Sequence, residues 1–365
     1  MIRFENVTKK FPNSDSFAVN KLDLVVPEGK ICVLIGPSGC GKTTTLKMIN
    51  RIIEPTSGTI YVDGKPNTDM DVTALRLNMG YVIQNIGLFP HMTIGDNVAT
   101  VLRELKWDKG SIADRVNELL HLVNLEPAVY EKRKPTQLSG GQQQRVGVAR
   151  ALAANPKIML MDEPFGAVDP ITRMKLQNEF INLQSQMNKT IIMVTHDIDE
   201  AMKMGDSIAI LREGVLVQHT TATELLKKPA NEFVETLIGT NRSLRQLDLA
   251  TVGEYARNGI ICTLSASQSI ADGVQSLERS GVEWIAVLEK NGTLKGIVCS
   301  KDIVGQTGTL GEYALYPANT VSQSNNMNDA LAAMLSMGEH HVVVLDDSEK
   351  FVGVVTLEDI FTVTR

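Results

Sequence analysis

Two short motifs contain the residues of this sequence that are best suited to chemistry. The first is Gly36-Pro37-Ser38-Gly39-Cys40-Gly41-Lys42-Thr43, which has the glycine spacing and the closing lysine and threonine of a phosphate-binding loop. The second is Leu138-Ser139-Gly140-Gly141-Gln142, which lies directly before a helical pattern. Many unrelated nucleotide-binding proteins share the first motif, so the second is needed to narrow the class of protein.

The phosphate loop predicts the roles of its own residues. Unpaired N–H groups at a helix N-terminus attract anions, so the backbone from Gly39 to Thr43 is expected to hold phosphate oxygens. Lys42 is expected to reach the β- and γ-phosphates, and the Thr43 hydroxyl to coordinate Mg²⁺. With Thr44, which follows in the helix, residues 36–44 form the expected ATP-binding segment.

Four polar residues follow apolar, strand-like segments. Asp162 and Glu163 come after the segment 157–161, Gln84 follows Gly80-Tyr81-Val82-Ile83, and His196 follows the segment 190–195. In an open α/β sheet, ligands bind at the carboxyl ends of the strands, so these side chains are expected to converge on the γ-phosphate. A carboxylate at Asp162 suits Mg²⁺, and Glu163 can accept a proton from the attacking water. The alternative for this pair is an acidic strand end that caps the next helix.

The periodicity of apolar residues predicts the elements that position these side chains. A mainly parallel sheet with helices on its faces gives an α/β fold for residues 1–240, interrupted by a helical insertion at about 85–138. The expected strands are 2–8, 22–27, 30–35, 58–64, 157–161, 190–194 and 207–211. The expected helices are 43–52, 94–105, 112–122, 145–154, 222–226 and 232–237.

The C-terminal third of the chain contains an internal repeat. Residues 270–304 align without a gap on residues 327–361, at an offset of 57 residues. Each unit has the pattern helix, strand, turn, strand, helix. We therefore predict a linker at 241–254 and two small α+β domains at 255–310 and 311–365.

Composition excludes several classes of protein. No apolar run is long enough to span a membrane, and the N-terminus lacks an export signal, which favours a cytosolic location. The four cysteines lack the spacing of a metal site. Residues 251–365 carry seven basic and fourteen acidic side chains, a charge of −7, and the whole chain carries −6. This distribution does not suit a nucleic-acid partner.

Residues 1–240 resemble the ATPase subunits of ABC transporters. The resemblance implies ATP as substrate with Mg²⁺ held by Thr43, Gln84 and Asp162, and catalysis by Glu163, His196 and Gln84. It also implies a D-loop at Ala167-Val168-Asp169. In the family, two subunits form a dimer in which Ser139, Gly140, Gly141 and Gln142 of one subunit complete the site of the other. Phe11 has the position of the aromatic residue that stacks on adenine; a packing role is equally compatible with the sequence.

The repeats resemble tandem CBS domains, whose motif is Gly, two apolar residues, Thr, two further residues and Asp. The second repeat has Thr356 and Asp359 at these positions, whereas the first has Asp302 but carries Cys299 in place of threonine. In nucleotide-binding members these side chains contact ribose and phosphate. The acidity of this region does not favour a polyphosphate ligand, and a structural dimerisation role is the alternative to sensing.

The combination resembles the ATPase of importers for glycine betaine, carnitine or choline. The resemblance implies transmembrane permease subunits, an extracytoplasmic substrate-binding protein and a peripheral location on the cytoplasmic face of the cell membrane. It further implies that the CBS pair regulates transport through ionic strength or cyclic di-AMP. The remaining alternatives are an importer for another osmolyte or an amino acid, a soluble ABC ATPase of DNA repair or translation, and a CBS-centred energy sensor.

Overall fold

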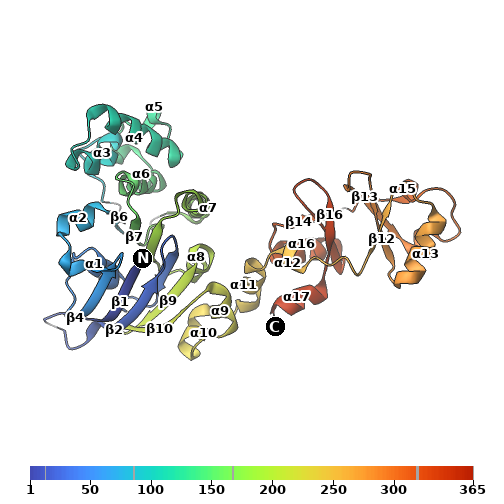
Figure 1. Ribbon diagram of the computed structural model, residues 1–365, viewed down its shortest axis with the longest axis horizontal. Coiled ribbons are helices and arrows are strands. Elements are labelled where there is room, and N and C mark those ends of the chain that lie inside the picture. Colours follow the sequence, from blue (N-terminus) through green and yellow to red (C-terminus); the bar gives the residue numbers. More distant parts are fainter. Residues whose placement is uncertain (13, 85–86, 167, 318–319, 365) are drawn as a thin grey trace. The chain divides into compact units, whose positions relative to one another are not determined.

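The computed structural model describes residues 1–12, 14–84, 87–166, 168–317 and 320–364. They form two compact units, Met1–Ile238 and Gly239–Arg365 (Figure 1). Among the described helices, none combines the length and the apolar character that a membrane span requires.

The first unit contains a small antiparallel sheet with the strand order β2-β1-β4-β5. Buried and exposed residues alternate along β2, which is typical of a strand that packs on the core through one face only. The sequence pattern predicts strands at 2–8, 22–27 and 58–64, but it does not predict that they form a sheet separate from the parallel sheet. The bounds are β1 (Ile2–Lys10), β2 (Phe17–Val26), β4 (Ser57–Val62) and β5 (Lys65–Pro66).

A second sheet of the same unit has the order β10-β9-β3-β8-β7-β6 and is parallel except for β10. Every residue of β3, β7 and β8 is buried, as expected of central strands with both faces covered. The bounds are β3 (Ile31–Ile35), β6 (Met79–Val82), β7 (Ile158–Asp162), β8 (Thr190–Val194), β9 (Ser207–Arg212) and β10 (Val215–Thr220).

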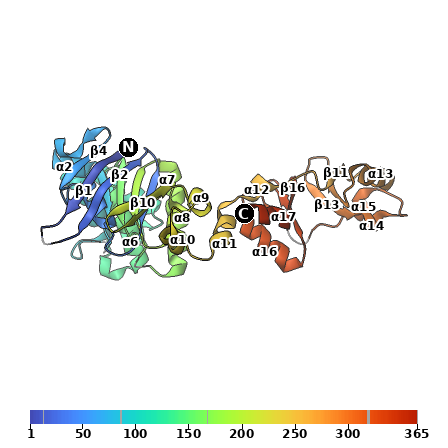
Figure 2. The ribbon, with the colours of Figure 1, turned by 90° about the horizontal axis from the view of Figure 1, so that it is seen from below.

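Helix α1 (Lys42–Ile49) packs between the two sheets, because it contacts β2 and β4 of one and β7 and β8 of the other. Its Leu46, Met48 and Ile49 side chains are fully buried in the core. The helix that follows the phosphate loop is therefore fixed on two sides. The other helices of this unit outside the insertion are α2 (Val72–Leu77), α7 (Pro170–Met187), α8 (Ile198–Met204), α9 (Ala222–Lys227) and α10 (Glu232–Ile238), and Figure 2 shows α8, α9 and α10 near β10.

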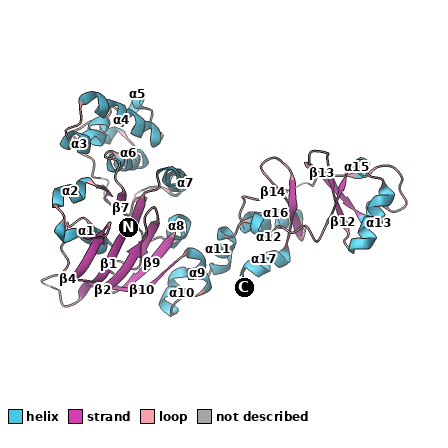
Figure 3. Ribbon diagram, viewed as in Figure 1, coloured by secondary structure: helices cyan, strands magenta, loops and turns pink. Residues whose placement is uncertain are grey.

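The described part of the insertion after β6 is helical, as the sequence predicted, and Figure 3 shows no strand from α3 to α6. Two of its helices begin at side chains that accept hydrogen bonds from the first turn, Thr93 for α3 and Asp108 for α4. Helix α6 contacts α3 and α4 and also strand β6, so it joins the insertion to the parallel sheet. The bounds are α3 (Ile94–Glu104), α4 (Lys109–Leu122), α5 (Pro127–Tyr130) and α6 (Gly140–Leu152).

The second unit contains the two repeats, each built on a three-stranded sheet. Equivalent helices end alike, with Gly281 and Gly338 in the left-handed conformation that glycine adopts without strain. The first repeat contains β11 (Cys262–Ser265), α13 (Ile270–Ser280), β12 (Trp284–Leu288), β13 (Leu294–Cys299) and α14 (Ser300–Ile303). The second contains β14 (Thr320–Ser322), α16 (Met327–Met337), β15 (His341–Leu345), β16 (Phe351–Thr356) and α17 (Leu357–Thr364).

The segment expected as a linker contains the helices α11 (Arg242–Leu249) and α12 (Val252–Tyr255). Helix α12 and helix α15 (Leu310–Tyr313) share the residues Gly-Glu-Tyr and each is followed by alanine. They are exchanged between the repeats: α12 contacts β14 and β16 of the second repeat, and α15 contacts β13 of the first. A Cβ atom at Gly296 would lie 2.8 Å from the Leu315 backbone, so this close approach explains the glycine in the repeat.

Candidate active site

The polar residues that the sequence placed at strand ends meet at one edge of the parallel sheet. The phosphate loop follows β3, Asp162 ends β7, His196 follows β8 and Gln84 follows β6. These four strands are neighbours in the order β3-β8-β7-β6, and all run parallel. Their carboxyl ends therefore bring the candidate residues together, as the parallel fold predicts.

The phosphate loop is held in a conformation that only glycine allows at two points. Gly36 and Gly41 have φ angles of 152° and 102°, and a Cβ atom at either would lie 2.1 Å from a backbone oxygen. The Lys42 ammonium group is buried within the loop, where it donates to the carbonyl oxygens of Gly36 at 2.7 Å and Pro37 at 2.9 Å. Pro37, Ser38 and Gly39 are exposed, so the outer face of the loop is open to a ligand.

Asp162 and Thr43 are joined by a hydrogen bond of 2.9 Å from the threonine hydroxyl to the carboxylate. Burial raises the pKa of the Asp162 carboxyl above its ordinary value, against the opposing effects of the Thr43 hydrogen bond and the Lys47 charge. Mg²⁺ prefers hydroxyl, carboxylate and phosphate oxygens and needs few protein ligands. This donor pair fits Mg²⁺, and the ion would there neutralise phosphate charge.

Glu163 lies at a turn that separates its side chain from that of Asp162. Its φ angle is 48°, in the left-handed region that residues other than glycine rarely adopt, and its N–H donates to Val194 O at 2.9 Å. The Gln84 amide donates to one Glu163 carboxylate oxygen at 2.8 Å, and His196 Nδ1 lies 3.5 Å from the other. The structure therefore places Gln84 and His196 on the two oxygens of the Glu163 carboxylate, which is suited to accepting a proton from water.

The loop that carries His196 depends on a buried group to which the sequence analysis gave no role. Glu200 is only 5% exposed and accepts hydrogen bonds from the Thr195 hydroxyl and the Gln177 amide. Burial raises the pKa of the Glu200 carboxyl. The Thr195 hydroxyl also accepts from the Asp197 N–H at 3.1 Å, so Glu200 positions the His196 loop through Thr195. Glu200 lies in the first turn of α8, three residues after the N-cap Asp197. An acidic residue there is typical of an ordinary helix start, so the sequence did not single out Glu200.

The glycine-rich signature motif begins α6. The Ser139 hydroxyl accepts from the Gln142 N–H at 3.3 Å, and the Gln142 side chain accepts from the Ser139 N–H at 3.0 Å. This reciprocal pair is a capping box, and it leaves the N–H groups of Gly140 and Gly141 at the helix start. Within the part of the chain that the structure describes, no hydrogen bond joins residues 139–142 to the phosphate loop.

The remaining predicted residues lie at the edges of the site. Phe11 is 38% exposed, and Lys9 Nζ lies 5.2 Å from its ring centre. A cavity of about 340 Å³ beside Pro37–Cys40 is lined by another aromatic side chain, Phe233, which had no sequence signal. Asp169 is exposed at the start of α7, whereas residue 167 of the D-loop lies outside the described residues.

The three CBS residues have different surroundings. Asp359 is fully buried, pairs with Arg257 and accepts hydrogen bonds of 2.9 and 2.8 Å from the Thr356 N–H and hydroxyl. Thr356 lines a cavity of about 370 Å³. Asp302, the equivalent of Asp359 in the first repeat, is exposed and lines a different cavity.

Comparisons with known proteins agree with this geometry. The ABC transporter family model matches residues 19–166, and the CBS domain model matches residues 252–306 and 310–364. Over 360 residues the chain is 44% identical to the glycine betaine/carnitine/choline transport ATP-binding protein OpuCA of Bacillus subtilis, with 98% of this chain and 94% of the relative covered. The chain belongs to the ABC transporter ATP-binding family. This ABC ATPase therefore hydrolyses ATP within a transporter.

Two further comparisons extend the result. The ABC ATPase is 42% identical over 356 residues to the osmoprotectant import ATP-binding protein OsmV of Salmonella typhimurium, with 97% of this chain and 93% of the relative covered. A solved dimer of the ATP-binding cassette MJ0796, bound to ADP and Pi, superposes with a TM-score of 0.55 at 35% identity. The match covers 61% of this chain and 99% of the MJ0796 chain. MJ0796 therefore corresponds to the cassette of this protein without the CBS domains.

Proposed function

We propose that this chain is the ATP-hydrolysing subunit of an importer for quaternary-amine osmoprotectants such as glycine betaine, carnitine or choline. The observation that carries the proposal is the similarity to OpuCA, a glycine betaine/carnitine/choline transport protein, over 98% of this chain. That similarity includes the CBS repeats as well as the cassette. A similarity confined to the cassette would have supported only a general ABC ATPase.

In this proposal, ATP binds along residues 36–44, with Lys42 at its β- and γ-phosphates and Thr43, Asp162 and Gln84 around Mg²⁺. Glu163 accepts a proton from the attacking water, while Gln84 and His196 position its carboxylate and the γ-phosphate. The hydrogen bonds of 2.9 Å between Thr43 and Asp162 and of 2.8 Å between Gln84 and Glu163 support these assignments. Phe11 is proposed to stack on the adenine ring.

We propose that the active form is a homodimer in which residues 139–142 and Asp169 of each subunit complete the site of the other. The N–H groups at the start of α6 can bind phosphate, because they lack partners within the helix. The dimeric structure of the related cassette MJ0796 with ADP and Pi supports this arrangement.

The same proposal places the subunit on the cytoplasmic face of the cell membrane, bound to permease subunits that work with an extracytoplasmic substrate-binding protein. Ile83 and Phe89 flank the Gln84 segment and are 36% and 40% exposed, so apolar surface lies next to a catalytic residue. Arg150 of α6 donates to the Gly87 carbonyl at 2.7 Å, which connects this segment to the signature helix. A permease that pushes on this surface can thereby move both.

The CBS pair is proposed to regulate transport, through ionic strength or cyclic di-AMP. Its charge of −7 over residues 251–365 supports ionic strength, because salt screens repulsion between exposed carboxylates. Titration calorimetry of the full chain with cyclic di-AMP separates the two: heat of binding supports the nucleotide, and its absence together with salt-dependent ATPase activity supports ionic strength.

The deciding experiment is reconstitution of the subunit with its permease and binding protein in proteoliposomes. The proposal expects ATP hydrolysis that glycine betaine, carnitine or choline stimulates, with uptake of the same solute. Glu163→Gln is the matched control, because it keeps the size of the side chain while removing the proposed base. Stimulation by nucleic acid instead would support a soluble ABC ATPase, and stimulation by an amino acid alone would support an importer of different specificity.

A further inference from the structure

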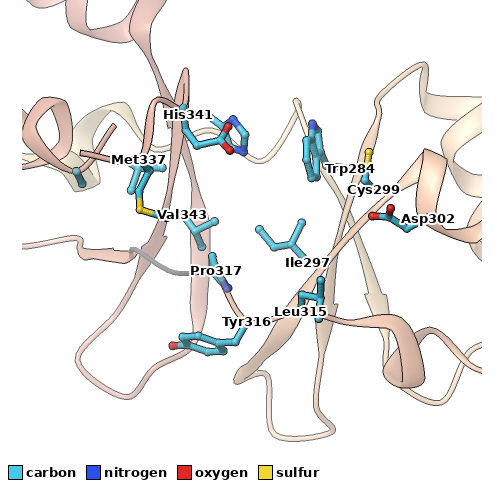
Figure 4. Close-up of a pocket in the computed structure, with 13 residues that line it drawn as sticks. Trp284, Ile297, Cys299, Asp302, Leu315, Tyr316, Pro317, Met337, His341 and Val343 are labelled. Carbon is cyan, nitrogen blue, oxygen red and sulfur yellow. The ribbon is translucent and has the colours of Figure 1, made fainter. Parts of the chain in front are cut away.

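A cavity of about 210 Å³ lies between the two repeats of the second unit. Its walls come from β12, β13 and α14 of the first repeat, from α16 and β15 of the second, and from the connection at residues 315–317. Figure 4 shows Trp284 and His341 facing one another at one end of the cavity, with Tyr316 at the other. The volume is below the range of sites for drug-sized ligands, so the occupant must be small.

The ends of the cavity are aromatic. Trp284 and His341 are equivalent positions of the two repeats, and their ring centres lie 5.4 Å apart at an angle of 49°. Tyr316 is 53% exposed, and Ile297 contributes apolar surface between them. Aromatic rings attract cations through the negative charge on their faces, and tryptophan does so most strongly.

The charged residues of the cavity are acidic. Asp302 and Glu339 line it, and none of the described lining residues is lysine or arginine. The surrounding region carries seven basic and fourteen acidic side chains over residues 251–365. This potential repels phosphate-bearing ligands and attracts a cation.

An asymmetry between the repeats explains why Asp302 is available. In the second repeat, Asp359 is neutralised by Arg257, whose backbone pairs with Val354. In the first repeat, Leu315 makes the equivalent backbone pair with Ile297 and so occupies the place of the arginine. In the part of the chain that the structure describes, no basic side chain pairs with Asp302. The pseudo-symmetric fold thus pairs one carboxylate with an arginine and, among the described residues, leaves the other at a cavity without a basic partner.

We propose that this cavity binds a small organic cation of the quaternary ammonium class. Such an ion combines a positive charge with an apolar methylated surface, and the cavity combines two carboxylates with aromatic walls. Binding of the cation is independent of the proposed function. The further statement that this cation is the solute that the transporter imports rests on the proposed function. Occupancy makes the CBS unit a sensor of that solute on the side of the membrane where the subunit lies.

The full chain contains a natural probe for the test. Its two tryptophans are Trp107 and Trp284, so the remaining fluorescence of Trp107→Phe comes from Trp284. This side chain lines both this cavity and the cavity beside Thr356, and the variants described below distinguish the two. Choline chloride is expected to change this fluorescence in a saturable way when ionic strength is held constant with sodium chloride. The uncharged isostere of choline, with carbon in place of the ammonium nitrogen, is expected to have no saturable effect.

Three variants in the Trp107→Phe background locate the binding site. Asp302→Asn is expected to weaken choline binding by about tenfold. Leu315→Arg introduces an arginine at the position equivalent to Arg257, where it can pair with Asp302. This variant is expected to abolish choline binding. Leu315 is 74% exposed, so the fold should tolerate this change. Glu358→Gln alters an acidic residue of the related cavity and is expected to leave binding unchanged.

The proposal is overturned by an equal response to the isostere, by a response to cyclic di-AMP or ATP without one to choline, or by no response at all. A loss in Glu358→Gln as large as in Asp302→Asn also overturns it, because the ligand would then lie in the other cavity. Transport is measured separately in proteoliposomes. Uptake of quaternary amines without cavity binding refutes only this inference, and cavity binding without uptake refutes only the proposed function.

Discussion

The replacement of Glu163 by glutamine tests the proposed chemistry most directly. The Glu163 side chain is 23% exposed, accepts a hydrogen bond of 2.8 Å from Gln84 and lies 3.5 Å from His196 Nδ1. Glutamine has nearly the same shape and can still accept from Gln84 through its amide oxygen. The substitution therefore removes the base and leaves the local packing and the phosphate loop in place.

The expected loss follows from general-base catalysis, which contributes about 100- to 10,000-fold to a rate. At 1.36 kcal/mol for each factor of ten, this is about 3–5 kcal/mol of activation free energy. Gln84→Ala removes the hydrogen bond to the Glu163 carboxylate, worth about 1.5–3 kcal/mol, together with the proposed Mg²⁺ contact of Gln84, so its expected loss is at least about 10- to 150-fold. If Gln84 acts by positioning Glu163, the two losses are not additive.

The assay is steady-state phosphate release by the reconstituted transporter, for both single variants and for the double variant. Binding of ATP by equilibrium dialysis and dimer formation with ATP by size-exclusion chromatography are measured in parallel. We expect Glu163→Gln to keep both while turnover falls. Turnover above a tenth of the original rate would assign the base to another residue, and a full Gln84→Ala loss in the Glu163→Gln background would show that Gln84 acts independently.

Three other outcomes follow from particular contacts. Burial raises the pKa of the Asp162 carboxyl in the folded protein above 3.8, so ionisation of this group opposes folding. Asp162→Asn should therefore raise the melting temperature of the nucleotide-free protein. The gain should increase as the pH rises above about 3.8 and level off once Asp162 is ionised in both states. A gain that shrinks with rising pH in thermal scans would contradict this. Arg257→Ala leaves the buried Asp359 charge unpaired and should lower the free energy of unfolding of the CBS unit by about 3 kcal/mol. The measurement is urea unfolding followed by Trp284 fluorescence in the Trp107→Phe background. Arg257→Lys keeps the charge and should lower the free energy of unfolding much less. Maleimide labelling of Cys40, whose Sγ lies 3.7 Å from Lys42 Nζ, should abolish ATP binding and be prevented by ATP; binding that survives complete labelling, confirmed by mass spectrometry, would refute it.

Much of the cassette could be predicted because its chemistry depends on local sequence. The apolar runs at 31–35, 158–161 and 191–194 are short and wholly buried, so they predict central strands whatever their neighbours are. A polar residue directly after such a strand must lie at the sheet edge. This reasoning predicts that Asp162, Glu163, His196 and Gln84 lie at one edge of the sheet, where the structure has them.

Other features depended on pairing between distant segments. Residues 2–8 were predicted as a strand, but whether they join the parallel sheet or form an antiparallel sheet depends on which strands they pair with, namely β2 and β4. Helix α11 was not predicted within the expected linker, because its stabilisation comes from contacts with α16 and α17, far away in the sequence. Glu200 likewise acquires its role only through the buried contacts with Thr195 and Gln177.

The sequence by itself determined the class of protein, the order of its candidate catalytic residues and the presence of a repeat, because glycine spacing and apolar periodicity are local properties of the chain. Only the tertiary structure decided which charges are neutralised. Asp302 and Asp359 are matching residues of a repeat, yet one lines a cavity and the other is buried against Arg257. The physical reason is that α12 and α15 are exchanged between the repeats. The residue at the equivalent position beside each repeat therefore comes from the segment that precedes the other repeat. It is Arg257 for the repeat of Asp359 and Leu315 for the repeat of Asp302.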